Sequence, residues 1–510
     1  MVGDSRCHDF VPIICRVLST GTLLGAHSVG ATNVYPPDLR AATGDSPDAT
    51  PLTEFGCVTP ILSATKDLSL RTSVTIPMSL LHSLKSHIPP SLLLPYHYAM
   101  ARVAAFAYGN PSDKLVVIGV TGTKGKSSTV QMIAQLLAAC GERVGYTSTA
   151  GFAINGRVIE NRMKMTMPGR FFLQRMLRDM VQEECTYAVV ETSSQGLTQF
   201  RHVGVNYDVA VFTNLTPEHI ESHGGFENYK AAKGLLFAHL TKRPKKIIDG
   251  KTIDKTIVVN QDDEHAEYFA SFPADGVVRF GWKNVQSVTR DGSGLRMTMR
   301  DVEFHVPLLA QFEQQNALCA IATLASLGIP LQKLATAASS LASVPGRFER
   351  ITCGQPFTVV VDYAYEPASI AALIASVRAL GVKRIIGVHG SAGGGRDVAR
   401  RDAIGRLAGT EDDVVIVTNE DPYDDNPAEI IHAVADGARA VGKVDNENLF
   451  TFDDRQDAID FAIAQAQPGD VVLVTGKGSE PVMAVAGGKK IAWDDRDAAR
   501  RALAKAGFAL

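Results

Sequence analysis

The chain has 510 residues, enough for about two to four domains with sizeable cores. A formal net charge of −3 gives no basic footprint for nucleic acid, and no charge-free apolar run reaches the ~18 residues of a transmembrane helix. We therefore expect neither nucleic-acid binding nor stable membrane insertion. Seven cysteines without CxxC pairs favour a reduced compartment, so a cytoplasmic protein is expected, most simply as a monomer.

Residues 1–77 are rich in Pro, Ser, Thr and Gly and lack sustained periodicity, which predicts a loop-rich or disordered extension. Residues 78–113 are predicted to be a helical lead segment, in which Tyr96–Tyr108 suits a helix ended by Gly109. Two interpretations of the extension stay open. Either translation starts at Met78, or the extension is a tail that docks on the core.

The remainder of the chain alternates β-type runs with helical stretches, which predicts an α/β fold. Residues 114–343 are expected to form a doubly wound parallel sheet, and residues 344–510 a Rossmann-like C-terminal domain. The β-type runs of the first block are Lys114–Ile118, Tyr187–Val190, Val209–Phe212 and Thr256–Val259, and those of the second are Phe357–Val361, Ile385–Val388, Val414–Val417 and Val471–Val474.

The string GVTGTKGKSSTV at Gly119–Val130 predicts a strand, a glycine-rich turn and a helix start, which together form a phosphate cradle. Gly122 and Gly125 let backbone amides approach phosphates, and Lys126 supplies a positive charge. The hydroxyl of Ser127 can bind Mg²⁺, so ATP and Mg²⁺ are the expected cofactors. The spacing exceeds the strict Walker A pattern by one residue, which points away from ordinary P-loop NTPases.

Seven motifs in fixed order extend this signal: GVTGTKGKSST, ETSSQGLTQFRH, VFTNLTPEHIESHG, YKAAKGLLF, VPGRFE, VDYAYEP and TGKGSE. From Leu115 to the C-terminus the chain resembles the Mur ligases, and most closely the MurE type. The resemblance implies an ATP-dependent ligase that adds an amino acid to UDP-N-acetylmuramoyl-L-alanyl-D-glutamate in peptidoglycan synthesis. Its partners would be that UDP-muramoyl dipeptide and an amino acid. The family's uridine-binding N-terminal domain has no recognisable counterpart here.

The resemblance also implies a metal and catalytic set. Glu191 matches the family's carboxylate ligand, and Lys233 matches the lysine that the family converts to a carbamate with CO₂. An unmodified ammonium would repel Mg²⁺, whereas a carbamate offers an anionic oxygen. Lys230 is the nearby alternative, but the family's spacing from Tyr229 selects Lys233. The implied metal ligands are Ser127, Glu191, His219 and Lys233, and the implied catalytic residues are Lys126, Glu191, His219 and Lys233.

Further positions match the family's nucleotide site. Asn316 would contact adenine, Arg347 would face the γ-phosphate, and Asp362 would hold the ribose, each with chemistry that suits its partner. The full implied set is Gly122, Thr123, Gly125, Lys126, Ser127, Ser128, Asn316, Arg347 and Asp362.

The two other substrates have implied positions as well. For the incoming amino acid, Arg396 would pair with the α-carboxylate, while Glu480 and the carbonyl of Gly476 would hold the ammonium. The positions that bind the muramoyl dipeptide are matched by Ser193, Gln199 and Arg201.

The sequence departs from the family where the amino acid is selected. Diaminopimelate-adding relatives carry a DNPR stretch whose arginine binds the distal carboxylate, and Tyr423 stands at that arginine's place here. Glu420 and Asp421 would accept a distal ammonium, which makes L-lysine the first candidate. Arg400 or Arg401 could instead replace the missing arginine, so diaminopimelate stays open.

Three further departures are Lys124, Tyr365 and Ser479, which replace a usual Asn, His and His. Two rival functions follow. One is a ligase of another acceptor, of the folylpolyglutamate or cyanophycin type, and the other is a non-catalytic nucleotide-binding scaffold. SSQGLTQFR and DYAYEP count against the first, and intact Lys126, Glu191, His219 and Lys233 count against the second.

Overall fold

The computed structural model describes residues 90–508, except 162, 164, 218–222 and 396–397. The predicted extension over residues 1–77 therefore lies outside the described residues. Helix α3 (Pro90–Ala107) begins earlier than the expected Tyr96. A single 3₁₀ turn (Pro111–Lys114) follows it. The sequence had suggested that Lys114 begins the first strand, but it belongs to this turn.

The first domain is built on an eight-stranded sheet with the order β10-β9-β6-β1-β5-β2-β3-β4. Its strands are parallel except β3 and β4, which add an antiparallel edge. The parallel α/β core is confirmed, whereas the antiparallel edge was not foreseen. The strands are β1 (Val116–Thr121), β2 (Val144–Ser148), β3 (Gly151–Ile154), β4 (Arg157–Ile159), β5 (Tyr187–Glu191), β6 (Val209–Phe212), β9 (Thr256–Asn260) and β10 (Gly276–Phe280).

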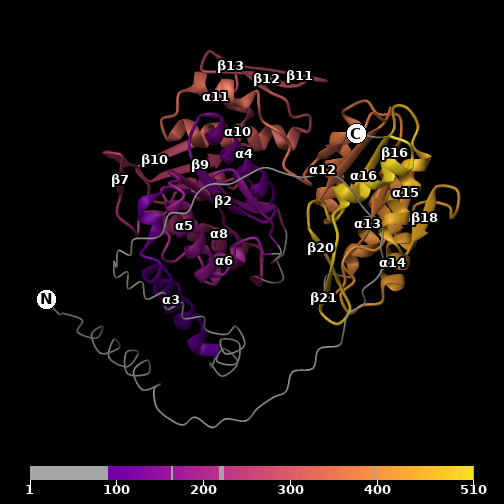
Figure 1. The fold of residues 1–510 in the computed structure, drawn as a ribbon, viewed down its shortest axis with the longest axis horizontal. Helices are drawn as coiled ribbons and strands as arrows, with labels where there is room; N and C mark the ends of the chain where they lie inside the picture. Colours follow the sequence, from indigo (N-terminus) through magenta and orange to yellow (C-terminus); the bar gives the residue numbers. More distant parts are fainter. Residues whose placement is uncertain (1–89, 162, 164, 218–222, 396–397, 509–510) are drawn as a thin grey trace, which may run out of the picture. The chain divides into compact units, whose positions relative to one another are not determined.

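Helices cover both faces of this sheet, which explains why all of β1 is buried (Figure 1). Ile118 and Val120 pack into the core on one face, with α4, α10 and α11, while Val117 packs into the core on the other, with α5 and α8. The helices are α4 (Lys126–Ala139), α5 (Arg170–Gln182), α8 (Phe226–Leu240), α10 (Gln311–Ser326) and α11 (Leu331–Ala338).

A second, three-stranded antiparallel sheet was not predicted. It comprises β11 (Ser287–Asp291), β12 (Gly294–Met299) and β13 (Val302–Val306). Every residue of β11 is exposed, so this strand has no apolar alternation from which to recognise it. The small sheet lies beside α11 in Figure 1.

The C-terminal domain is a six-stranded sheet with the order β14-β15-β19-β16-β17-β18. All pairs are parallel except β14 with β15; the parallel part agrees with the expected Rossmann-like domain, and the antiparallel edge was not predicted. The strands are β14 (Glu349–Ile351), β15 (Thr358–Asp362), β16 (Ile385–His389), β17 (Val414–Thr418), β18 (Leu449–Phe452) and β19 (Val471–Thr475).

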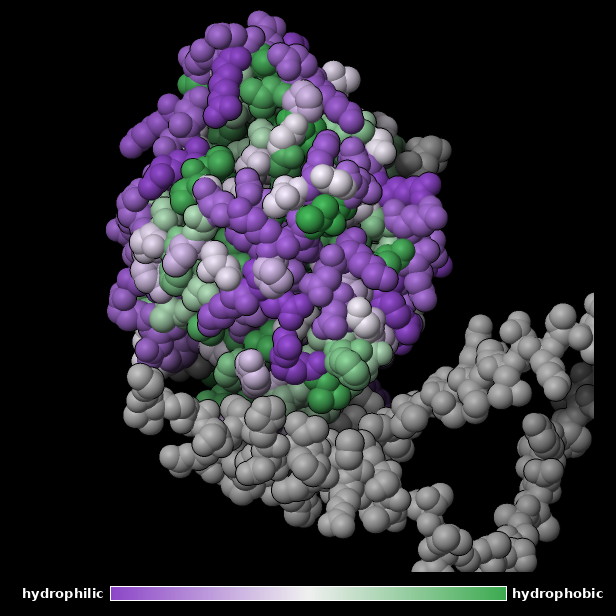
Figure 2. Space-filling view, turned by 90° about the vertical axis from the view of Figure 1, so that its left-hand side faces the viewer, coloured by the Kyte–Doolittle hydropathy of each residue, from purple (hydrophilic) through white to green (hydrophobic). Residues whose placement is uncertain are grey.

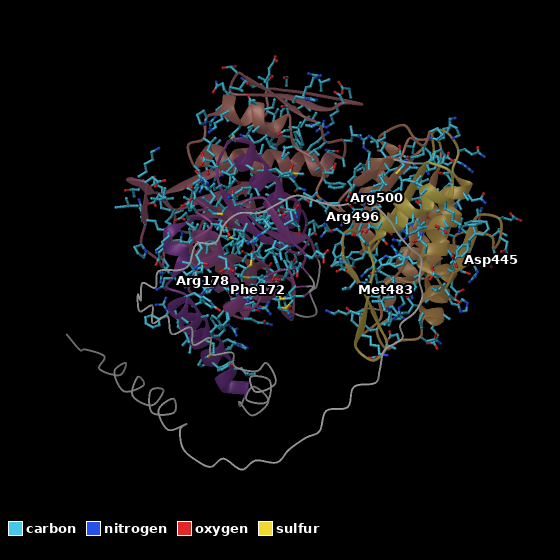
Figure 3. The ribbon with its side chains drawn as sticks, in the orientation of Figure 1. Phe172, Arg178, Asp445, Met483, Arg496 and Arg500 are labelled. Atoms are coloured by element: carbon cyan, nitrogen blue, oxygen red, sulfur yellow. The ribbon has the colours of Figure 1, made fainter. Side chains whose placement is uncertain are left out.

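Helices also cover both faces of the C-terminal sheet. One core lies under the first three of its helices and the other under the last two. Figure 3 shows Arg496 and Arg500 on the last of them, and both pair with Glu349 on β14. The helices are α12 (Pro367–Arg378), α13 (Ala399–Glu411), α14 (Pro427–Arg439), α15 (Arg455–Gln465) and α16 (Asp495–Lys505).

The surface shown in Figure 2 is more hydrophilic than these cores. Figure 2 shows a face on which hydrophilic residues predominate and hydrophobic ones form small, separated patches. Isolated exposed apolar residues are normal for a folded chain, because there is too little polar surface to cover it.

A buried charge cluster ties the strand that precedes the phosphate loop to its neighbour. Asp208, fully buried just before β6, accepts a hydrogen bond from the backbone N–H of Val117 on β1 at 2.8 Å. Its carboxylate also pairs with the ammonium groups of Lys246 and Lys255, both of which are buried. Burial lowers the pKa of Lys246 to about 8 despite the attraction of Asp208.

Removing the carboxylate should therefore destabilise the first domain. We expect Asp208→Asn to lower the free energy of unfolding by about 3–5 kcal/mol, because two buried ammonium groups would lose their counterion. Urea unfolding at pH 7 measures the change. The control is Asp254→Asn, which breaks the largely exposed pair with Lys245 and should cost at most about 0.5 kcal/mol. Equal, small losses in the two variants would contradict the structural role of Asp208.

Candidate active site

The phosphate loop connects the end of β1 to the start of α4 and is closely packed on both sides. Gly122 has φ 154°, and a Cβ there would lie 2.0 Å from Oγ1 of Thr213. Gly125 has φ 77°, and a Cβ there would lie 2.3 Å from Oδ1 of Asn316. Both positions therefore need glycine, which leaves the backbone open to a ligand.

Two side chains of this loop bond to groups nearby. Lys126 donates from Nζ to the carbonyl of Thr123 at 2.7 Å. Ser127 donates from Oγ to Glu191 at 2.8 Å, and Glu191 is buried at the carboxyl end of β5. The same carboxylate accepts from the backbone N–H and the hydroxyl of Thr149, at 2.7 and 3.1 Å. No motif pointed to Thr149, because it lies in a turn that the sheet brings to Glu191.

Lys233 on α8 contacts the phosphate loop. Its side chain is buried, and Nζ donates to the carbonyl of Gly122 at 2.7 Å. The ammonium also lies 4.2 Å from the ring centre of Tyr229, whose hydroxyl is 3.2 Å from Oγ1 of Thr123. The carbonyl of Gly122 and the ring of Tyr229 thus hold the ammonium of this buried lysine against the glycine loop. His219, the remaining member of the implied metal set, lies outside the described residues.

A cavity of about 930 Å³ collects most of the implied nucleotide-binding residues. Within it, Asp362 is buried and accepts backbone hydrogen bonds from Phe348 and Ala364, both at 2.7 Å. Burial raises the pKa of Asp362, an effect that the guanidinium of Arg347 opposes. The residues of the implied set that line the cavity are Thr123, Gly125, Lys126, Ser127, Ser128, Asn316, Arg347 and Asp362.

The same cavity has a wall that motif reasoning missed. Trp282 lies in a short 3₁₀ turn after β10, and Arg290 on β11 places its guanidinium 4.7 Å from the indole ring centre. Arg290 also donates to Oε1 of Gln314 at 2.6 Å. An aromatic ring held by a cation at a pocket wall is chemistry suited to stacking a planar base. The only available signal was that Trp282 is one of just two tryptophans in the sequence.

The implied acceptor residues lie together but serve local structure as well. Ser193 caps α6 (Ser194–Thr198) by accepting from the N–H of Gly196 at 3.1 Å. Gln199 accepts from Arg201 at 2.6 Å through its side chain and from Arg170 at 2.8 Å through its carbonyl. Burial lowers the pKa of both guanidinium groups. Arg170 thus adds a second cation to this cluster, and no motif indicated it.

The GKGSE loop carries a compact ion network. Lys477 is fully buried, and its Nζ contacts both oxygens of Asp421 at 2.9 and 3.0 Å and Glu480 at 2.6 Å. Gly476 has φ 106° and donates to the carbonyl of Asp362 at 3.1 Å. Lys477 thus forms ion pairs with both Asp421 and Glu480, so one ammonium is shared between two carboxylates. Arg396 lies outside the described residues.

Glu420 differs from Asp421 in its hydrogen bonding. It is buried, and its Oε2 has no hydrogen-bond partner among the described residues. Burial raises the pKa of Glu420 to about 7, although Arg455 and Lys477 favour the ionised form. Arg455 itself is buried against Asp495 and was not singled out from the sequence, since its partner is 40 residues away.

Tyr423, at the position of the missing arginine, is closely packed. Tyr423 has φ 54°, donates its N–H to the carbonyl of Ala484, and lies so close to Gly394 that a Cβ there would meet its ring at 2.7 Å. Arg400 donates to Glu366 at 2.9 Å, and Arg401 donates to Asp425 at 2.9 Å. Both alternative cations are thus engaged by carboxylates.

Among residues 90–508, with the gaps noted above, no three His, Cys, Asp or Glu side chains cluster as metal ligands. No helix in that part of the chain is long and apolar enough to span a membrane.

Comparison with known families gives two matches. The model described as "Mur ligase middle domain" matches residues 120–324, and "Mur ligase, glutamate ligase domain" matches residues 346–478. The UDP-N-acetylmuramyl-tripeptide synthetase of Roseiflexus sp. (strain RS-1) is 38% identical over 434 residues, which cover 82% of this chain and 84% of the relative.

A second relative extends further along the chain. The UDP-N-acetylmuramoyl-L-alanyl-D-glutamate–2,6-diaminopimelate ligase of Geobacillus thermodenitrificans (strain NG80-2) is 34% identical over 482 residues, covering 92% of this chain and 95% of the relative. The unmatched 8%, about 41 residues, is shorter than the segment 1–77, so the match reaches into that segment.

Solved structures agree with the fold. A UDP-N-acetylmuramoyl-L-alanyl-D-glutamate–2,6-diaminopimelate ligase matches with a TM-score of 0.54 and 26% identity, over 82% of this chain and 84% of that one. A Mycobacterium tuberculosis folylpolyglutamate synthase complexed with ADP and AMPPCP matches with a TM-score of 0.57, over 78% of this chain and 95% of that one. At 19% identity it shows the fold alone. The resemblance inferred from the motifs is confirmed, and this chain belongs to the Mur ligase family.

Proposed function

We propose that the protein is an ATP-dependent, ADP-forming ligase that joins an amino acid to the D-glutamyl γ-carboxylate of a UDP-N-acetylmuramoyl dipeptide in peptidoglycan synthesis. The observation that carries this proposal is the cavity in which the phosphate loop, Glu191, Arg347 and Asp362 meet. The names of the relatives supply the acceptor. Four described cysteines are free and buried, which is compatible with a cytoplasmic enzyme.

The residues divide the chemistry between them. Lys126 and Arg347 would hold the transferred phosphoryl group while the γ-carboxylate of the acceptor attacks phosphorus and ADP leaves. The amine would then attack the acyl phosphate, lose a proton and expel phosphate. ATP makes the electrophile, so the reaction needs no nucleophilic side chain. Asn316 and Asp362 would position the nucleoside.

The donor set fits Mg²⁺ if Lys233 is modified. Ser127 and Glu191 offer oxygens 2.8 Å apart, of the hard type that Mg²⁺ prefers. Lys233 as an ammonium would repel the ion, whereas a carbamate at the same place would provide an oxygen. His219 completes the proposed ligands. When bound, Mg²⁺ would offset negative charge on the phosphoryl group.

The added amino acid is proposed to be L-lysine. Tyr423 holds the place of the carboxylate-binding arginine, and Glu420 offers the one unpartnered carboxylate oxygen found in that loop. The relatives named as diaminopimelate ligases define the alternative. A basic side chain close to Glu420 would favour its ionised form, since an opposite charge lowers a carboxyl pKa.

Lys233→Ala should abolish phosphoryl transfer, because the variant lacks the proposed anionic oxygen beneath the phosphate loop. Short carboxylates added in solution should restore part of the activity. The matched control is Lys230→Ala, one turn earlier on α8, where Lys230 pairs with the exposed Glu227. Its turnover should stay within about twofold of wild type. Acceptor-dependent phosphate release measures both variants, and near-normal turnover of Lys233→Ala would refute the role.

Trp282 should report on nucleotide binding. The chain has two tryptophans, so Trp493→Phe leaves Trp282 as the only indole. Titrating this variant with ADP should quench or shift its emission, because a base stacked at the cavity wall changes the environment of the ring. Trp282→Phe, in which only Trp493 emits, is the control and should show no change. A response confined to Trp493 would place the base elsewhere.

Competition at equal concentrations should identify the amino acid. We expect predominant L-lysine product, because the distal carboxylate of meso-diaminopimelate would be left unpaired, at about 2–5 kcal/mol. Mass spectrometry of the product separates the two. Tyr423→Arg should gain diaminopimelate activity and Tyr423→Leu should not. Predominant diaminopimelate product from the wild type would reject L-lysine, and no gain in Tyr423→Arg would reject the mechanism.

A further inference from the structure

Two loops of the C-terminal domain are pressed together without side chains between them. Gly346, in the turn that carries Arg347, has φ 66°, and a Cβ there would lie 2.1 Å from the backbone N of Ser479. Gly478 has φ 54°, and its Cβ would lie 2.7 Å from the carbonyl oxygen of Gly346. The turn with the proposed phosphate-binding arginine thus lies directly on the loop that ends in Glu480.

Tyr363 spans this junction with its side chain. The guanidinium of Arg347 lies 4.1 Å from the centre of its ring, which is cation–π distance. Its hydroxyl donates to Oε1 of Glu480 at 2.9 Å. Burial raises the pKa of Tyr363 well above its usual value, so the hydroxyl stays protonated and remains a donor at neutral pH.

The network is anchored at the far side of Glu480. Its Oε2 accepts from Lys477 at 2.6 Å, and Lys477 is held in turn by Asp421. Asp421 also accepts from the N–H of Ala484 at 2.7 Å, which fixes it to β20 (Val482–Val485). Glu480 is therefore held from both of its oxygens.

The turn at Gly346 is fixed in a similar way. Its N–H donates to Glu349 at 2.7 Å, and Glu349 pairs with Arg496 and Arg500, which Figure 3 labels on α16. Ion pairs therefore hold both segments next to Tyr363, which are the turn at Gly346 and the loop that ends in Glu480.

We propose that Tyr363 is a positioning residue that sets the distance between the phosphate-binding arginine and the carboxylate that receives the amino group of the incoming amino acid. This inference rests on the proposed function. Its basis is the Arg347–Tyr363–Glu480 array, because the amine must meet an acyl phosphate formed beside Arg347. The ring contacts Arg347, which would bind the nucleotide's phosphate, and the hydroxyl contacts Glu480, which would bind the amino acid. Substitutions can therefore change the binding of the two substrates separately.

The test uses two substitutions in the full chain. Tyr363→Phe keeps the ring and removes the hydroxyl, so the KM for the amino acid should rise about tenfold, as expected for one lost hydrogen bond to a charged group. The KM for ATP should stay within about twofold. Tyr363→Leu also removes the ring, so AMP-PNP binding measured by calorimetry should weaken as well, by about fivefold or more.

Tyr187→Phe on β5 serves as the control for removing a partly buried tyrosine hydroxyl, and all kinetic constants should stay at wild-type values. The proposal is overturned if Tyr363→Phe leaves the amino-acid KM unchanged, or if it raises both KM values equally. A wild-type protein that forms no amide product would instead overturn the proposed function. In that case weakened AMP-PNP binding by Tyr363→Leu would still support the contact with Arg347, and unchanged binding would refute it.

Discussion

The glycine loop at the end of β1 is the constraint on which the rest of the site depends. Thr213 and Asn316 approach it so closely that a methyl group at Gly122 or Gly125 would overlap them. Lys233 donates to the same loop from beneath. Because side chains from α8, from α10 and from the residue that follows β6 converge there, the packing of the first domain also fixes the geometry of the proposed phosphate site. Asp208 and its two lysines secure the opposite end of β1, which explains why charges are buried so far from the chemistry.

The parts of this arrangement that are local in sequence could be predicted from it. The phosphate loop needs glycine and lysine at short spacing, and buried parallel strands read as continuous apolar runs, so both were visible. Strand ends were less exact: β1 runs on to Thr121 and β15 to Asp362, because hydrogen bonding continues past the last apolar residue. The β11–β13 sheet was missed because β11 is exposed throughout.

Non-local electrostatics could not be predicted. The pairing of Asp421 with Lys477, 56 residues later, is not visible in any local pattern. Arg455 and Asp495 form a fully buried pair that no local pattern indicates. Tyr363 lies inside the VDYAYEP motif but no role was predicted for it, Trp282 lies in no motif, and the fold brings both to the cavity. The roles of such residues depend on the partners that they contact in the folded protein. The family resemblance implied roles for residues inside the motifs, and it was silent on the network that surrounds them.

The proposed function requires that the acceptor's carboxylate is activated by phosphoryl transfer in this cavity. The most direct measurement uses UDP-N-acetylmuramoyl-L-alanyl-D-glutamate labelled with ¹⁸O in the γ-carboxylate, incubated with ATP, Mg²⁺ and the amino acid. Mass spectrometry of the phosphate should find one ¹⁸O atom per molecule released, because an acyl phosphate transfers one carboxylate oxygen to phosphorus. Amide product accompanied by phosphate without ¹⁸O, or phosphate release that does not require the acceptor, would contradict the account.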